Sequence, residues 1–259
     1  MPRINFGTWS VGRLAVITVC FPLFGFIFCL FYSFVYHFDK TTYTHCEVPN
    51  FSPSISAAIG SFAPQKYVWQ TAIALHIGPR FFFVDLYRRY FQNKCDFSKT
   101  KIIRRVIVTV HILSVIENAS LLGLTIVSSA DIFAIHKFCF GAFITSSFLY
   151  MLLVSYVLFN PRLSGYNSQG RNDRISLLFK RRIFKAQFLS IPLLLYFYYR
   201  HNSFCEPYVY SFFCITEYFI VLSNMGFHMT AFYDFKGTVL MTSTLNSAGY
   251  GILPDMSNA

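Results

Sequence analysis

The chain contains 259 residues, of which 54% are apolar, 20% are aromatic and only 13% are charged, and its formal net charge at pH 7 is +11. Because a soluble domain usually has about a quarter charged residues, this composition excludes a soluble globular domain, a disordered chain and a coiled coil. The seven Cys form neither a CxxC pair nor a Cys/His series at zinc spacing, so no metal site is predicted. The sequence indicates a polytopic membrane protein.

The hydrophobic stretches predict the membrane topology. A spanning helix needs about 20 predominantly apolar residues, and six stretches meet or approach that length. We predict an all-α, polytopic membrane helix bundle with six transmembrane helices in a single membrane domain, 1–236, followed by a flexible cytosolic tail, 237–259. The fifth stretch is short and contains Gln187 and Pro192, so five spans remain an alternative. The predicted spans are 14–36, 67–87, 106–130, 138–159, 183–199 and 208–233.

The basic residues predict the orientation of these spans. With six spans, both termini and the loops 88–105 and 160–185 lie on one side of the membrane, and that side carries 17 Lys and Arg. This asymmetry predicts that both termini are cytosolic. Basic loops beside membrane helices suit anionic lipid headgroups, so membrane lipids account for the positive charge and no nucleic-acid partner is predicted. The opposite side carries only Lys40, Lys66, Lys137 and Arg200.

The predicted lumenal loops contain candidate modification and binding residues. Cys46 and Cys205 lie in two of these loops, and in an oxidising compartment they either form a disulfide or remain two free thiols. Asn50 begins an Asn-Phe-Ser sequon and is a candidate glycosylation site, although a proline follows the sequon directly. Arg200 and His201 directly follow the fifth predicted span, and this basic site either binds a substrate phosphate or is a solvated helix end.

Ionisable and amide side chains inside the predicted spans are further candidate functional residues. Such groups are costly in a membrane and usually face the interior of a helix bundle. Two interpretations compete for them. They either form counter-ion pairs and hydrogen bonds that join helices, or they include a histidine base that a carboxylate orients. For the set as a whole, the functional interpretation is favoured over the structural one. Its members are His76, Arg80, Glu117, Asn118, Glu217, Asn224 and His228.

Several long motifs rich in Trp, His, Cys and Pro occur between residues 13 and 236. They are His45-Cys46-Glu47-Val48-Pro49-Asn50, Ala58-Ile59-Gly60, Pro64-Gln65-Lys66-Tyr67-Val68-Trp69, Leu75-His76, Pro79-Arg80-Phe81, Glu117-Asn118, Tyr199-Arg200-His201-Asn202, Cys205-Glu206, Glu217-Tyr218, Val221-Leu222, Asn224-Met225-Gly226-Phe227-His228-Met229-Thr230-Ala231 and Asp234-Phe235. Together they resemble the Frag/DRAM/Sfk group of multispan membrane proteins, and within it the family of the GPI-anchor lipid-remodelling factor called post-GPI attachment to proteins factor two. The basic loop and the tail carry no matching motif.

The resemblance implies a multi-pass protein of the Golgi membrane, or of the endoplasmic reticulum membrane, that remodels GPI anchors after their attachment to protein. In that process the lyso form is reacylated at sn-2 with a saturated chain, which supports stable display at the cell surface. The implied partners are membrane lipids and lyso-GPI-anchored proteins, with acyl-CoA as the candidate donor and no tightly bound cofactor. The alternatives are a non-enzymatic accessory factor that presents lyso-GPI to a separate acyltransferase, and a lipid transporter or scramblase.

A mechanism follows as a hypothesis. A histidine deprotonates the sn-2 hydroxyl, which attacks an acyl thioester; a glutamate orients the imidazole, and an arginine or asparagine stabilises the oxyanion. No GxSxG, HExxH, P-loop or GxGxxG motif points to another chemistry. The catalytic candidates are His76, Glu117, Glu217 and His228, and the substrate-binding candidates are Arg80, Asn118, Arg200, His201 and Asn224.

Overall fold

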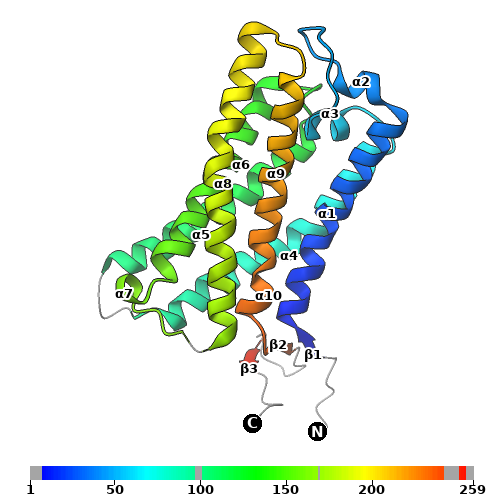
Figure 1. Ribbon diagram of the computed structural model, residues 1–259. Helices are drawn as coiled ribbons and strands as arrows, with labels where there is room; N and C mark the ends of the chain where they lie inside the picture. The colour runs from blue at the N-terminus through cyan, green and yellow to red at the C-terminus, as the bar shows by residue number, and fades with distance from the viewer. Residues whose placement is uncertain (1–7, 97–100, 169, 242–250, 255–259) are drawn as a thin grey trace.

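The computed structural model describes residues 8–96, 101–168, 170–241 and 251–254. Long helices dominate the molecule and pack side by side as a bundle (Figure 1). The long helices are α1 (Val11–Tyr36), α4 (Gln65–Lys94), α5 (Lys101–Ile126), α6 (Phe133–Leu152), which continues as the π-helix η1 (Leu153–Leu158), α8 (Arg171–Phe204) and α9 (Val209–Met229). The short helices are α2 (Phe38–Thr42), α3 (Ile55–Gly60), α7 (Pro161–Ser164) and α10 (Ala231–Asp234).

The long helices form a closed bundle with two distinct ends. Neighbours in the chain pack against each other, and the bundle closes because α1 also packs against α9. One end, which we call the sheet end, carries the strands and both chain termini (Figure 1). The opposite end, which we call the distal end, carries α2, α3 and the connection between α8 and α9. The chain crosses the length of the bundle in alternating directions.

The coarse prediction of an all-α polytopic membrane protein is confirmed. Among the described residues, four helical stretches are long and apolar enough to cross a membrane, judged by length and composition: Val11–Tyr36, Lys101–Ile126, Phe133–Leu158 and Val209–Asp234. The helices α4 and α8 have sufficient length but contain more polar and basic residues. The helix α8 begins at Arg171, well inside the predicted loop 160–185, because Lys, Arg and Leu are all good helix formers.

The N-terminal part of α8 contains a buried basic residue, Lys180, which the sequence analysis assigned to the loop 160–185. Lys180 is only 1% exposed, and its ammonium donates to Ser176 Oγ at 2.6 Å, Thr230 Oγ1 at 2.6 Å and Asp234 Oδ2 at 2.5 Å. Tyr87 OH donates to the same carboxylate oxygen at 2.6 Å. Because a buried charge is tolerated only with a partner and further hydrogen bonds, this network fastens α8 to α10 and α4 at the sheet end.

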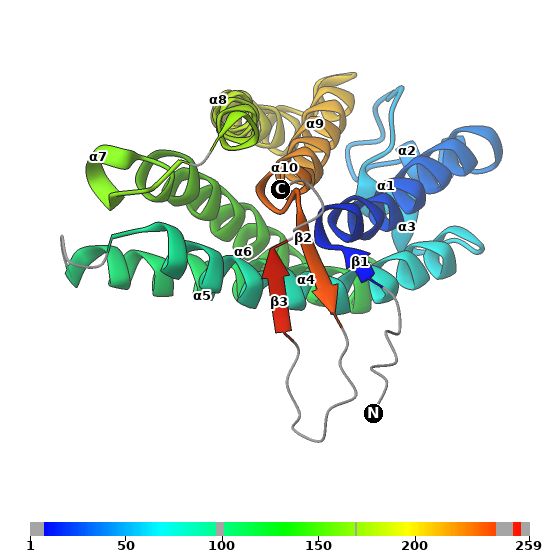
Figure 2. The ribbon, with the colours of Figure 1, turned by 90° about the horizontal axis from the view of Figure 1, so that it is seen from below.

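The chain termini contribute a small antiparallel sheet. Its strands are β1 (Thr8–Ser10), β2 (Thr238–Met241) and β3 (Gly251–Pro254), in the order β1-β2-β3. Figure 2 shows the three strands side by side across the sheet end of the bundle. Within the tail that the sequence predicts to be flexible, 238–241 and 251–254 form strands, because β2 pairs with β1 and β3 pairs with β2. Hydropathy cannot reveal such pairing, and the flexibility of the tail stays a prediction. Residues 242–250 and 255–259 lie outside the described residues.

Small residues allow two helix pairs to approach closely. A Cβ on Gly25 of α1 would lie 3.0 Å from Ala72 Cβ of α4, and a Cβ on Gly123 of α5 would lie 2.8 Å from Cys139 Sγ of α6. Between membrane helices, close van der Waals packing at small residues is a main source of association energy. These two glycines therefore help set the spacing of the walls that enclose the interior described below.

Candidate functional site

A cluster of charged and amide side chains lies inside the bundle where α4, α5 and α9 meet. Arg80 Nη2 lies 3.4 Å from Glu117 Oε1 and 3.0 Å from His228 Nε2. His228 Nε2 is 2.8 Å from the same carboxylate oxygen, and Asn224 Nδ2 donates to that oxygen at 2.8 Å. Arg80 Nε donates to Asn118 Oδ1 at 3.0 Å. The fold thus brings five of the sequence candidates into one network, which we call the Arg80 cluster.

The Arg80 cluster joins helices and reaches the interior space only on one side. All five side chains are buried, so each charge depends on the others for stabilisation. Only Asn224 and His228 border the cavity described next; the arginine, the glutamate and the second asparagine lie behind them. Because His228 Nε2 is already engaged by Glu117 and Arg80, that nitrogen is poorly placed to accept a proton from a substrate.

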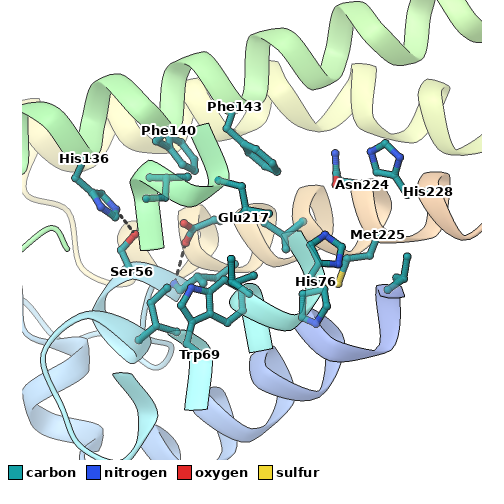
Figure 3. A pocket seen from close by; sticks show the side chains of 18 residues that line it. Ser56, Trp69, His76, His136, Phe140, Phe143, Glu217, Asn224, Met225 and His228 are labelled. Atoms are coloured by element: carbon teal, nitrogen blue, oxygen red, sulfur yellow. Dashed lines mark hydrogen bonds between the residues drawn. The ribbon is translucent and has the colours of Figure 1, made fainter. Parts of the chain in front are cut away.

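A cavity of about 70 Å³ extends from this cluster towards the distal end. Figure 3 shows its polar residues spread along its length: His76 and Asn224 lie near one end, Glu217 lies in the middle, and Ser56 and His136 lie at the other end. We call the end with His76 and Asn224 the inner end, and the end with Ser56 and His136 the outer end. The remaining walls are mainly apolar side chains of α1, α3, α4, α5, α6 and α9. Such a lining favours alkyl chains and presents few polar groups to them.

His76 is the candidate base at the inner end. Its Nδ1 lies 2.6 Å from the carbonyl oxygen of Thr18, and because a carbonyl only accepts, Nδ1 must carry the proton. The neutral ring then has its lone pair on Nε2, which has no hydrogen-bond partner among the described residues and belongs to a side chain that borders the cavity. This tautomer leaves a proton acceptor available, as a general base requires.

A larger cleft of about 530 Å³ adjoins the outer end of the cavity. Its walls are predominantly apolar side chains of α6, α8 and α9, together with the segment 43–57 that leads into α3. Ser56, His136, Phe140 and Glu217 border both spaces. The two spaces therefore meet at these four side chains. Their combined shape is a wide apolar cleft that narrows into a cavity with polar groups along it.

Glu217 holds the start of α3 at this junction. It is 4% exposed, and its Oε2 accepts a hydrogen bond from the backbone N–H of Ile55 at 3.0 Å. Ser54 caps the same helix, since its Oγ accepts from the backbone N–H of Ala57 at 3.1 Å. These contacts fix the position of Ser56, the residue between them.

The sequence analysis grouped Arg200 and His201 as a candidate phosphate site, but their side chains face different parts of the molecule. The guanidinium of Arg200 forms an ion pair with Glu206, donating from both Nε and Nη2, and the hydrogen bond raises the pKa of Arg200. His201 is 2% exposed and borders the cleft beside His45, with ring centroids 5.3 Å apart. Burial lowers the pKa of His201, and the neighbouring His45 lowers it further. Only the histidine therefore reaches the cleft.

The residues proposed for covalent modification lie at the distal end. Cys46 and Cys205 form a disulfide that joins positions 159 residues apart, with their Cα atoms 5.3 Å apart. This bridge ties the segment before α3 to the end of α8, and both border the cleft. His45 lies close to the two sulfur atoms, but in the disulfide neither sulfur is a thiolate ligand. Asn50 Nδ2 donates to Thr42 O at 3.3 Å and Val48 O at 3.1 Å; glycosylation there stays a prediction.

The sequence analysis missed one pair of side chains at the junction. Ser56 Oγ and His136 Nε2 lie 2.8 Å apart, although the two residues are 80 positions apart in the chain. Hydropathy places His136 only at a membrane edge and gives Ser56 no special role. No spacing pattern identifies the pair, because it exists only where α3 touches the start of α6.

These features define a polytopic helical membrane protein whose interior joins an apolar cleft to a cavity with buried histidines and carboxylates. The family model described as the Frag1/DRAM/Sfk1/Cwh43P N-terminal domain matches residues 10–238. This match includes every long helix and the side chains of both the cavity and the cleft. No solved structure matches the chain.

Individual relatives identify a narrower family than the domain model does. The chain is 39% identical over 238 residues to Acyltransferase PGAP2 of Xenopus tropicalis, covering 92% of this chain and 90% of the relative. It is 40% identical over 224 residues to Post-GPI attachment to proteins factor 2 of Drosophila melanogaster, covering 86% and 85%. The protein of the same name from Caenorhabditis elegans is 36% identical over 241 residues, covering 90% and 89%. The chain therefore belongs to the post-GPI attachment to proteins factor 2 family.

Proposed function

We propose that this protein remodels the lipid of GPI anchors after their attachment to protein, by acylating the lyso form at sn-2 with a saturated chain. Two relatives carry names that refer to post-GPI attachment, and a third is named an acyltransferase. Family membership supports the remodelling role, and the acyltransferase name supports the reaction. The proposed acceptor is a lyso-GPI-anchored protein, and the proposed donor is acyl-CoA.

The observation that carries this proposal is the junction between the cleft and the cavity. A cleft of about 530 Å³ with mostly apolar walls suits the alkyl chains of a lipid. It leads to side chains that can move a proton, with an imidazole at each end of the cavity, His76 and His136. A non-enzymatic lipid carrier needs the apolar walls, but it does not need a histidine held in the tautomer that accepts a proton.

The chemistry of acyl transfer requires a base and a dry, oriented site. His76 or His136 can remove the proton of an acceptor hydroxyl, and the apolar walls exclude water that would otherwise hydrolyse the donor. The Arg80 cluster is less suited to proton transfer, because its carboxylate and His228 are committed to each other. We therefore assign that cluster a positioning role, in which it holds Asn224 and His228 at the inner end.

The proposed topology has six spans, with the sheet end in the cytosol and the distal end in the lumen of the Golgi apparatus or the endoplasmic reticulum. The six long helices supply these spans, including α4 and α8, whose polar residues are largely buried or basic and near the sheet end. The positive-inside bias supports the orientation. The cleft, lined in part by the segment 43–57, would then open towards the leaflet that holds GPI anchors.

Filling the cleft tests the proposal. Gly141 borders the cleft, and a Cβ there would meet no atom within 4 Å, so we expect Gly141→Trp to place its indole ring in the cleft. Purified protein in lipid nanodiscs receives lyso-phosphatidylinositol and labelled stearoyl-CoA. We expect acyl transfer by the native chain and at least a tenfold loss in the variant. Gly78→Trp is the matched control, because Gly78 is also helical, exposed and free of neighbours within 4 Å but borders neither space.

The alternatives predict different results in the same assay. An accessory factor binds the lyso-lipid but transfers no acyl chain, so the native chain would be inactive and Gly141→Trp would lose only binding. A scramblase moves labelled lipid between the leaflets of vesicles that contain no acyl donor. Either result with a folded protein contradicts the acyltransferase assignment.

A further inference from the structure

Ser56 and His136 form a hydrogen-bonded pair that no motif in the sequence identifies. Ser56 lies in the first turn of α3, and His136 lies in the first turn of α6. Their Oγ and Nε2 atoms are 2.8 Å apart (Figure 3). That separation lies within the range expected between a nucleophile and its general base. The pair is separate from the Arg80 cluster, which lies at the other end of the cavity.

The surroundings of His136 fix the direction of this hydrogen bond. Its Nδ1 lies 2.8 Å from the carbonyl oxygen of Val127, and a carbonyl can only accept, so Nδ1 carries the proton of the neutral ring. Nε2 then holds the lone pair and accepts the hydroxyl proton of Ser56. The carbonyl has the orienting role that a carboxylate fulfils in a Ser-His-Asp triad. His136 is 6% exposed, which keeps water away from the ring.

The pair also has access to substrate space. Both side chains border the cavity and the cleft, and Ser56 is only half-buried. A Ser or Thr hydroxyl with a purely structural role in a helix commonly donates to a backbone carbonyl in the preceding turn. Thr18, Ser146 and Ser190 do so here. Ser56 instead donates across to another helix, at the point where an alkyl chain in the cleft would end.

We propose that Ser56 is a nucleophile and His136 its general base in a double-displacement acyl transfer, in which Ser56 Oγ carries the acyl group as an ester. This inference rests on the acyltransferase function proposed above and assigns its reacting atoms. The donor class is a fatty-acyl ester or thioester, supplied by a membrane phospholipid or by acyl-CoA. The carrier of the acyl group is the protein itself, so donor and acceptor need not occupy the cleft together.

The two half-reactions balance in atoms and protons. In the first, His136 Nε2 takes the proton of Ser56 Oγ, and the oxygen attacks the acyl carbonyl. The bond from the carbonyl carbon to the donor oxygen or sulfur breaks, and the leaving group takes the proton from the imidazolium. In the second, Nε2 takes the proton of the sn-2 hydroxyl of the lyso-lipid. That oxygen attacks the seryl ester, and Ser56 Oγ leaves with the proton.

Glu217 has a positioning role in this arrangement. Its carboxylate accepts from the backbone N–H of Ile55, the residue before the nucleophile, and it borders both spaces. The imidazole of His136 is held instead by Ser56 and the carbonyl of Val127. Glu217 therefore orients α3 rather than the imidazole. This differs from the direct-transfer hypothesis, in which a glutamate orients the base and no covalent intermediate forms.

The test separates acyl-enzyme formation from overall transfer. Purified protein in dioleoylphosphatidylcholine nanodiscs is first given a labelled donor without acceptor, either stearoyl-CoA or a phosphatidylcholine with a labelled stearoyl chain. We expect label on the protein, located at Ser56 by mass spectrometry, and released when lyso-phosphatidylinositol is added. The donor that labels the protein identifies the source of the acyl group.

Four variants make the assignment falsifiable. Ser56→Ala and His136→Ala should lose transfer by about 100-fold or more, with unchanged melting temperature. Ser56→Cys should still take up label, now as a thioester that neutral hydroxylamine releases, which a structural serine would not produce. Ser61→Ala is the matched control, because this exposed hydroxyl follows the same short helix and borders neither space; it should transfer normally.

The outcomes distinguish this inference from the proposed function. If the native chain transfers no acyl group, the acyltransferase function fails and the assignment fails with it. If the native chain transfers normally and Ser56→Ala does too, the function stands and the nucleophile assignment is overturned. Loss of transfer in Ser56→Ala, with no label on either the native chain or Ser56→Cys, also overturns the covalent step. Label at Ser56 that the acceptor removes supports it.

Discussion

At the scale of single residues, Glu117 shows how the fold converts a costly group into a stabilising one. Its Oε1 interacts with Arg80, Asn224 and His228, which come from two other helices. A carboxylate in this position would be strongly unfavourable alone, but its partners offset the cost of burial. Removing one partner of such a network leaves the others uncompensated.

The first prediction concerns this carboxylate. Glu117→Gln keeps the size of the side chain but removes the charge that balances Arg80, so we expect the free energy of unfolding to fall by about 3 kcal/mol. Chemical denaturation in a lipid nanodisc measures it. Asp85→Asn is the control, because its pair with Arg89 is exposed, and it should cost less than about 1 kcal/mol. Equal effects of the two changes would show that the cluster is not a stabilising contact.

At the scale of elements, α8 combines two kinds of sequence in one helix. Its first half carries most of the basic residues of the predicted loop, and its second half is apolar. The ordering of the basic half depends on tertiary contacts, since Lys180 faces inward towards Asp234 while Lys185 is exposed. The helix continues through the region of mixed polarity because both halves bury one face in the bundle.

The second prediction concerns this buried ion pair. Lys180→Met leaves the Asp234 carboxylate buried with Tyr87 as its one remaining side-chain donor among the described residues, so we expect a loss of about 3 to 5 kcal/mol in stability. Adding Asp234→Asn to that variant should recover part of the loss, since no uncompensated charge then remains. Thermal unfolding of each purified variant provides the measurement. Lys185→Met, which removes an exposed ammonium from the same helix, should leave the melting temperature unchanged; a matching drop there would contradict the argument.

At the scale of the whole molecule, the two ends of the bundle carry different structural features. The sheet end gathers the termini, the strands and the Lys180 network, while the distal end gathers the disulfide, α3 and the residues that join the cleft to the cavity. Because the disulfide ties two walls of the cleft together, its partners are fixed relative to each other even though the segment 43–54 contains no helix. The proposed orientation then assigns substrate access to one side of the membrane.

The third prediction tests that orientation. Single cysteines at Ser61, at the distal end, and at Arg162, at the sheet end, are introduced in a background that retains only Cys46 and Cys205 as the disulfide. Both positions are exposed. In sealed vesicles with the cytosolic face outward, a membrane-impermeant maleimide should label position 162 and reach position 61 only after detergent is added. Labelling of both positions without detergent would contradict the proposed six-span topology.

The sequence alone determined the class of the protein and the members of the buried Arg80 cluster. Long apolar runs have few alternatives to membrane helices, because only helices and closed barrels satisfy the backbone in lipid, and polar residues within such runs must face inward. For that reason Arg80, Glu117, Asn118, Asn224 and His228 could be selected before the fold was known, and the fold brings them into contact. The family, too, followed from motifs that are local in the chain.

What only the tertiary structure decided was the contact between segments far apart in sequence. No local pattern marks Ser56 or His136 as functional, and the sequence places Lys180 in a basic loop. The reason is that hydropathy depends on a residue's neighbours in the chain and not on its neighbours in space. The pairing of β1 with β2 has the same cause. Helix packing creates these contacts, and the spacing of residues along the sequence carries no information about how helices pack.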